Sequence, residues 1–169
     1  MLYILEVQQF IVQAVPFNQV LGITVAHIAP ESVEVVLPEA PERRNHIGTM
    51  HAAAQFGLGE ATSGTLVVAA FRDLFQQGIV PLATKATITY RKAASGELRG
   101  KAFLTQQEQQ RIRDEVIQEK RSRFTLPVQL MTSDGTLTTE LEVSWSLLKQ
   151  QMLGINASLK CWQVGNVSR

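Results

Sequence analysis

The sequence is poor in the residues that build disulfides and metal sites. It has one cysteine, Cys161, and three histidines among 169 residues. A single cysteine cannot form a disulfide within the chain, and three histidines without a cysteine cluster match no recognisable set of metal ligands. His46 and His51 lie five residues apart, whereas pairs of metal ligands on one helix face prefer a spacing of four. We therefore predict no metal site.

An excess of charge of one sign is also missing. The chain carries 16 Lys and Arg against 15 Asp and Glu, and these residues are dispersed. No basic face large enough to bind duplex nucleic acid is expected, so the sequence predicts no nucleic-acid partner.

Long hydrophobic runs are absent as well. No run approaches the roughly 18 to 20 residues that a membrane-spanning helix needs. The apolar N-terminus lacks the basic start of a signal peptide and contains Glu6, Gln8 and Gln9. We expect a soluble, cytoplasmic protein without a membrane span. Hydrophobic residues still make up 45% of the chain, which is enough for one core.

Hydrophobic spacing predicts the elements of a single domain over residues 1–150. An amphipathic helix is expected over 2–15, ended by Pro16. A polar segment at 106–122 is expected to form a solvated helical insertion. Strands are predicted at 22–29, 32–38, 82–93, 96–105, 123–132 and 136–148. The first two are expected to form a hairpin, a turn at 94–96 is expected between the third and fourth, and Ser133, Asp134 and Gly135 join the last two as a hairpin. Residues 151–169 show no clear periodicity and are expected to form a C-terminal extension.

The longest predicted helix begins near Thr49, its expected N-cap, and ends before Gly78. Its first half is rich in alanine and glycine, and each interior glycine costs about 1 kcal/mol relative to alanine. Several together indicate that another backbone or a ligand approaches closely. An antiparallel sheet of about six strands, with this helix covering one face, predicts an α+β fold.

The entrance of this helix holds the residues that suggest chemistry. Asn45, Gly48 and His51 precede a run of alanines, and Glu60 follows nine residues after the histidine. Nine helical residues place His51 and Glu60 about half a turn apart and about 13 Å apart along the axis. They cannot meet within one chain. Either at most one of them is functional, or a two-fold axis brings together two copies of the helix.

This spacing resembles the helix entrance of hotdog-fold acyl-CoA thioesterases of the phenylacetate-degradation type. That family reads N-x-x-G-x-x-H-G-G, followed by an acidic residue, usually Asp, eight or nine positions later. The stretch ITYRKAASGEL at 88–98 also resembles the family's central strand. Here Ala52 and Ala53 replace the paired glycines, and Glu60 replaces the commoner Asp.

The resemblance implies a homodimeric, possibly tetrameric, hotdog protein that hydrolyses an acyl-CoA thioester without a cofactor. The backbone N–H of Ala52 would stabilise the oxyanion with help from the helix dipole. Glu60 of the facing subunit would act as general base or nucleophile. His51 and Asn45 would orient the thioester or the attacking water.

Four further residues are candidates for substrate binding. Gly48 provides either a positive φ or room for a ligand. Thr84 is one of two positions for a hydroxyl that some family members carry early in the third strand. Lys85 and Thr87 belong to a polar strand face that lines either the site or the solvent.

Each candidate has a structural alternative. Glu60 could form a salt bridge with Lys85, His51 could bond a backbone carbonyl, and Asn45 could only shape the turn before the helix. For the whole chain, the alternatives are a non-catalytic module that binds acyl-CoA or a fatty acyl group, a hotdog dehydratase or hydratase, and a purely structural dimerisation domain.

Overall fold

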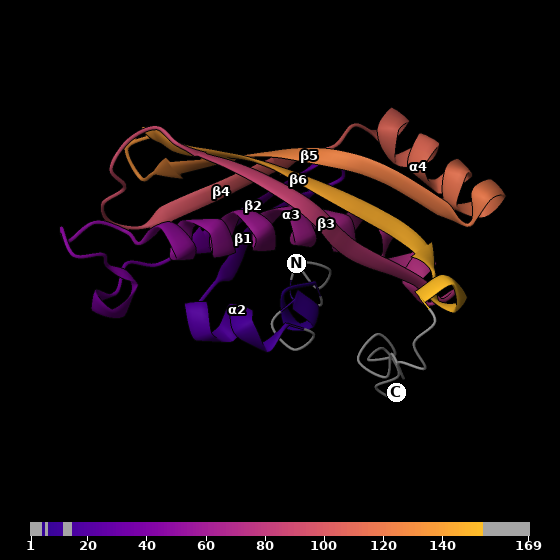
Figure 1. The fold of residues 1–169 in the computed structure, drawn as a ribbon, viewed down its shortest axis with the longest axis horizontal. Helices are drawn as coiled ribbons and strands as arrows, with labels where there is room; N and C mark the ends of the chain where they lie inside the picture. Colours follow the sequence, from indigo (N-terminus) through magenta and orange to yellow (C-terminus); the bar gives the residue numbers. More distant parts are fainter. Residues whose placement is uncertain (1–4, 6, 12–14, 154–169) are drawn as a thin grey trace.

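The computed structural model describes residues 5, 7–11 and 15–153, which form an α+β unit (Figure 1). Residues 5 and 7–11 are helical, Val15 is not, and the other residues of the helix predicted over 2–15 lie outside the described residues. The same holds for 154–169 of the predicted extension. The elements that follow are α2 (Pro16–Leu21), β1 (Thr24–Ala29), β2 (Ser32–Leu37), the 3-10 turn η1 (Pro41–Arg43), α3 (Ala52–Phe75), β3 (Ile79–Tyr90), β4 (Leu98–Phe103), α4 (Gln106–Glu119), β5 (Arg121–Thr132), β6 (Leu137–Lys149) and the 3-10 turn η2 (Gln150–Leu153).

The six strands form one antiparallel sheet in the order β1-β2-β4-β5-β6-β3. Both predicted hairpins are confirmed, β1 with β2 and β5 with β6. In the second turn the Asp134 carboxylate accepts hydrogen bonds from the Thr136 N–H and the Thr132 hydroxyl, and Gly135 takes a φ of +84°. The turn predicted at 94–96 does not join a hairpin, because β3 and β4 are neighbours in sequence but do not pair. α3 carries the chain to the far edge of the sheet, where β3 pairs with β6.

α3 lies across one face of the sheet, which arches over it (Figure 1). Side chains of β5 alternate between buried and exposed, so one face of the sheet packs on α3 and the other faces outward. Two helix glycines are closely approached, but by leucine side chains and not by the backbone or ligand that the sequence predicts. A Cβ at Gly57 would collide with Leu21 of α2, and one at Gly59 with Leu141 of β6. The predicted α+β hotdog fold, a sheet of six strands wrapped around a long helix rich in small residues, is therefore confirmed.

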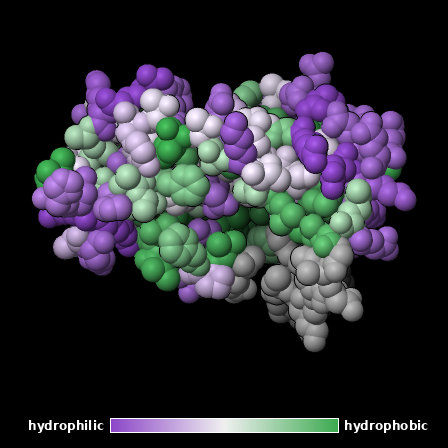
Figure 2. All heavy atoms as spheres, viewed as in Figure 1, coloured by the Kyte–Doolittle hydropathy of each residue, from purple (hydrophilic) through white to green (hydrophobic). Residues whose placement is uncertain are grey.

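Two short helical segments pack on the side of α3 that the sheet does not cover. The N-terminal helical residues and α2 lie on the side of α3 away from the sheet (Figure 1). Apolar side chains stay exposed over α2, where Phe17 is 60% and Val20 is 75% exposed (Figure 2). In the described part of the chain, no helix combines the length and apolarity needed to cross a membrane.

The predicted insertion forms α4, which packs against β5 and the C-terminal end of α3. Ile112 and Val116 are buried, while Ile117 is exposed. The Arg113 guanidinium lies 5.4 Å from the centre of the Phe71 ring and donates to the Asp73 carboxylate at 2.7 Å. The insertion is thereby attached to the C-terminal end of α3.

Candidate active site at the entrance and flank of α3

A tight loop precedes α3, and the Asn45 side chain holds it together. Its Oδ1 accepts hydrogen bonds from the N–H groups of Ile47 at 3.1 Å and Thr49 at 3.0 Å, and its Nδ2 donates to Thr49 Oγ1 at 2.8 Å. Gly48 takes a φ of +80°, which favours glycine, and a Cβ there would meet open space. Asn45 and Gly48 therefore shape the loop that delivers the chain to α3.

His51, not Thr49, is the N-cap of α3. Its Nδ1 accepts a hydrogen bond from the Ala53 N–H at 3.0 Å. Sequence reasoning favours Thr49 because threonine is a common cap. The Thr49 hydroxyl instead accepts from Asn45, and the helix begins later than predicted. Because Nδ1 is an acceptor here, the neutral imidazole carries its proton on Nε2.

Ala52 is the first residue of α3 and is exposed. An N–H at this position has no acceptor within the helix, so it is available to a ligand. Tyr90 at the end of β3 donates its hydroxyl to the Ala52 carbonyl at 3.1 Å. The entrance of α3 therefore lies beside the C-terminal end of β3.

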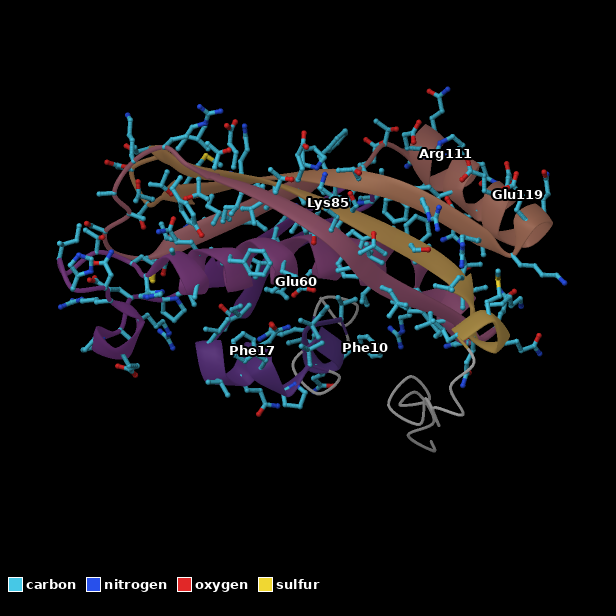
Figure 3. All side chains as sticks on the ribbon, in the orientation of Figure 1. Phe10, Phe17, Glu60, Lys85, Arg111 and Glu119 are labelled. Atoms are coloured by element: carbon cyan, nitrogen blue, oxygen red, sulfur yellow. The ribbon has the colours of Figure 1, made fainter. Side chains whose placement is uncertain are left out.

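Glu60 lies further along α3, in a pocket of about 230 Å³. Figure 3 shows it on the side of α3 toward the N-terminal segment. The pocket walls come from the N-terminal helical segment, α2, α3, β3 and β6: Phe10, Ile11, Val15, Asn18, Ala61, Gly64, Val67, Val68, Pro81, Leu82, Ala83 and Trp145. Most of these side chains are apolar.

The Glu60 carboxylate has no counter-charge within the described residues. It is partly buried, and burial raises its pKa above the usual value of 4.5. Loss of hydration disfavours the charged form, and an unpaired carboxylate in such a place is costly. A group of this kind is a candidate for proton transfer.

Lys85 and Thr87 lie on the other face of the sheet. Lys85 is opposite Ser144 and Thr87 is opposite Glu142, and these partners alternate with the buried Val143 and Trp145. Figure 3 shows Lys85 and Glu60 on opposite sides of the sheet. The alternative salt bridge between Glu60 and Lys85 is therefore not formed.

Thr84 directly follows the three residues of β3 that line the pocket, and it is not itself a lining residue. It sits at a bulge in β3, between Ala83 and Lys85, and its hydroxyl donates to the Ser144 carbonyl at 3.2 Å. Ala83, just before the bulge, lines the Glu60 pocket. The bulge therefore separates the pocket-facing part of β3 from its polar outer face.

The chain thus carries two separate groups of candidate residues. His51 and Ala52 are at the helix entrance, and Glu60 is nine residues along the helix in its own pocket. Sequence reasoning missed two walls of that pocket, the N-terminal segment and Trp145. The apolar periodicity of the N-terminus was the available signal for the first wall. No sequence signal pointed to Trp145 as a pocket wall, because an aromatic residue in a strand usually belongs to the hydrophobic core.

No group of three His, Cys, Asp or Glu side chains is arranged to hold a metal ion in the described ranges. The candidate residues are instead a carboxylate, a helix-end amide and a neutral imidazole. This set is suited to acid–base and acyl-transfer chemistry.

A long helix wrapped by a six-stranded antiparallel sheet defines a hotdog-fold protein. More particularly, the chain belongs to the family described as "Domain of unknown function (DUF4442)", whose profile matches residues 6–147. A search of curated proteins gives no match.

Several solved structures share this fold. PA5026 from Pseudomonas aeruginosa, described as a "Probable Thioesterase", has a TM-score of 0.75 and 25% identity over 84% of this chain and 93% of its own. A Chlorobaculum tepidum protein of unknown function has a TM-score of 0.76 and 12% identity, covering 85% and 93%. A mutant of the thioesterase PA1618 from Pseudomonas aeruginosa has a TM-score of 0.65 and 14% identity, covering 84% and 93%. The last two similarities establish the fold alone.

Proposed function

We propose that this protein hydrolyses acyl-CoA thioesters at two sites that a homodimer shares between its subunits. The main observation in support is that the Glu60 carboxylate is partly buried in an apolar pocket and has no counter-charge within the described residues. The similarity to PA5026 supports acyl thioester chemistry in general. The fold itself hosts several functions, so the argument rests on the site.

The exposed edge of the sheet supports dimer formation. β3 is an edge strand of 12 residues, and residues 82–90 are exposed except for the partly buried Ile88. A long open edge with unpaired N–H and C=O groups readily pairs with another strand. The large apolar side chains of Leu82 and Tyr90 are also exposed along this strand. A second copy of β3 would bury both.

The orientation of α3 relative to β3 supports a shared site. Tyr90 bonds Ala52, while Leu82 lines the pocket of Glu60. If two β3 strands pair antiparallel about Ala86, the middle of the exposed stretch, then residue 90 of one strand lies opposite residue 82 of the other. The helix entrance of one subunit then approaches the Glu60 pocket of its partner.

In this arrangement Glu60 of one subunit removes a proton from water, and the water oxygen attacks the thioester carbonyl carbon. The electron pair displaced onto the carbonyl oxygen is stabilised by the Ala52 N–H of the other subunit, by the His51 Nε2–H and by the helix dipole. The tetrahedral intermediate then expels the thiolate, which takes the proton back from Glu60. The products are a carboxylic acid and free coenzyme A.

The other predicted site residues do not contact the reacting atoms in this proposal. Asn45 and Gly48 hold the loop that presents the helix entrance, and Thr84 supports the pocket wall at the bulge of β3. Lys85 and Thr87 lie on the outer face of the sheet and take part in no step of this hydrolysis.

A subunit-mixing experiment tests the shared site. Glu60→Gln removes the base, and Ala52→Pro removes the N–H donor at a helix position that tolerates proline. Each variant alone should lose about 100-fold or more of kcat/KM in release of free thiol from acyl-CoA. Equal mixtures, unfolded and refolded together, should regain about one quarter of wild-type activity, because half of the dimers then hold one intact site.

Each result has a clear meaning. Mixtures that stay inactive, although wild type treated identically recovers, would contradict a site shared between subunits. Full activity of Glu60→Gln would contradict hydrolysis by this carboxylate. Binding of acyl-CoA without turnover that depends on Glu60 would instead favour a non-catalytic acyl-CoA-binding module.

A further inference from the structure

One glycine of α3 differs from its neighbours in what surrounds it. Side chains at Gly57 and Gly59 would collide with Leu21 and Leu141, so packing explains both glycines. A Cβ at Gly64 would lie 3.6 Å from the Trp145 ring, an ordinary contact distance. Packing therefore allows alanine at Gly64, and alanine is the better helix former.

Gly64 lines the same pocket as Glu60. It follows Glu60 by four residues, so both lie on one side of α3. The Trp145 ring opposite Gly64 is fixed by its Nε1–H, which donates to Ser63 Oγ at 3.1 Å. Because this wall is held in place, the missing side chain at Gly64 leaves space in the pocket.

The pocket lining favours apolar groups over charged ones. Its described walls contain no cationic side chain, and Glu60 and Asn18 are its only polar side chains. A charged or strongly polar group placed there would lose its hydration without a partner. A volume of about 230 Å³ has room for about seven or eight groups of the size of a water molecule or methylene.

We infer that this pocket holds the unsubstituted apolar acyl chain of the thioester, up to about eight carbons long, and that Gly64 keeps room for it. This inference rests on the proposed function, since it assigns the substrate class of the same site. Gly64 of α3 and Phe10 of the N-terminal helical segment both line the pocket and determine the chain length that fits. Acyl groups that carry a free carboxylate at the far end of the chain are excluded from this pocket. Glu60 would repel that carboxylate, and no cationic side chain of the described walls would pair with it.

The test measures binding without requiring hydrolysis. Trp162→Phe leaves Trp145 as the only tryptophan, so its fluorescence reports on the pocket wall. The full chain with this substitution is titrated with S-alkyl coenzyme A thioethers of four to sixteen carbons, which cannot be hydrolysed as thioesters. Kd should fall by about fourfold for each added methylene up to about eight carbons and then level off.

Two further variants move this limit in opposite directions. Gly64→Ala adds a methyl group to one wall and should shorten the limiting chain by one or two carbons. Phe10→Ala removes a ring from another wall and should lengthen it. Opposite shifts cannot come from general destabilisation, which would weaken binding of all chain lengths together.

The outcomes separate this inference from the proposed function. If both variants shift the limit while acyl-CoAs show no turnover dependent on Glu60, the pocket assignment stands and the hydrolysis proposal fails. If turnover depends on Glu60 but Kd shows no chain-length limit, or a limit that neither variant moves, the pocket assignment is overturned and the hydrolysis proposal stands.

Discussion

Two carboxylates on opposite sides of the sheet occupy contrasting environments. Glu34 of β2 faces outward and contacts Arg99 Nη1 at 2.7 Å and Lys101 Nζ at 3.3 Å. These hydrogen bonds and charges, chiefly that of Arg99, lower the pKa of Glu34 below 4.5. Burial raises the pKa of Glu60, and no cation within the described residues offsets it.

The contrast shows how the same side-chain type serves two purposes. Cross-strand partners are available on the outer face, since β2 and β4 place Glu34 directly opposite Lys101. The flank of α3 offers Glu60 only apolar neighbours and an asparagine. An unpaired, desolvated carboxylate destabilises the fold, so its presence indicates a role in chemistry or binding.

The largest expected difference between the two carboxylates is catalytic. Glu60→Gln should lower kcat/KM for acyl-CoA hydrolysis by about 100- to 10,000-fold, because the base is lost while the shape is kept. Glu34→Gln, the matched change on the outer face, should stay within about threefold of wild type. Thiol release measured with both purified variants checks this, and equal losses in the two would remove the functional distinction.

A smaller effect should follow from giving Glu60 the kind of partner that Glu34 has. Gly64→Lys places an ammonium group four residues after Glu60, in the favourable order for a helical ion pair. The pKa of Glu60 should then fall toward its usual value, because the nearby positive charge favours the ionised form, and carboxyl NMR titration can measure this fall. Gly64→Gln has a similar bulk without the charge and serves as control. An equal fall in both variants would show that the change does not come from the added charge.

The smallest expected difference concerns stability and its dependence on pH. The pKa of Glu60 is higher in the folded state than in the unfolded state. The protonated carboxyl group therefore contributes its full stabilisation below pH 4.5, and this contribution is lost as the pH rises through the folded-state pKa. Glu60→Gln should therefore gain about 1 kcal/mol in free energy of unfolding at pH 8 relative to wild type, and little at pH 4. Urea unfolding at the two pH values measures this.

Glu34 provides the control of opposite sign. Its folded-state pKa is lowered, so its stabilising effect is present above pH 4.5 and is lost as pH falls through the folded value. Glu34→Gln should cost about 0.5 kcal/mol at pH 8, because the ion pairs are only partly buried. A loss of stability at pH 8 for Glu60→Gln as well would contradict the environment assigned to Glu60.

Local features of the fold could be predicted from the sequence, because they depend on residues close together in the chain. Helical periodicity indicated α3, and the Ser133–Gly135 turn indicated the last hairpin. The position of β3 at the far edge could not be predicted in the same way. Its pairing with β6 joins residues 49 to 70 positions apart, and the crossover of α3 determines it.

The candidate site was predictable to a similar degree. The spacing of Asn45, Gly48, His51 and Glu60 placed the candidate residues on α3 and on the loop that precedes it. Alternation along β3 identified a polar face at Lys85, but which face turns toward α3 depends on the pairing with β6. The pocket around Glu60 also needs Phe10, which lies 50 residues earlier, and no local pattern relates the two.

The cap of α3 also restricts what can bind at its entrance. Because His51 Nδ1 accepts the Ala53 N–H, the imidazole presents a proton outward on Nε2. Ala52 adds an N–H beside it, so both of these groups are donors. An incoming carbonyl or phosphate oxygen finds matching partners in them. A zinc or nickel ion would need the Nε2 lone pair, and freeing it would transfer the proton to Nδ1 and break the first hydrogen bond of the helix.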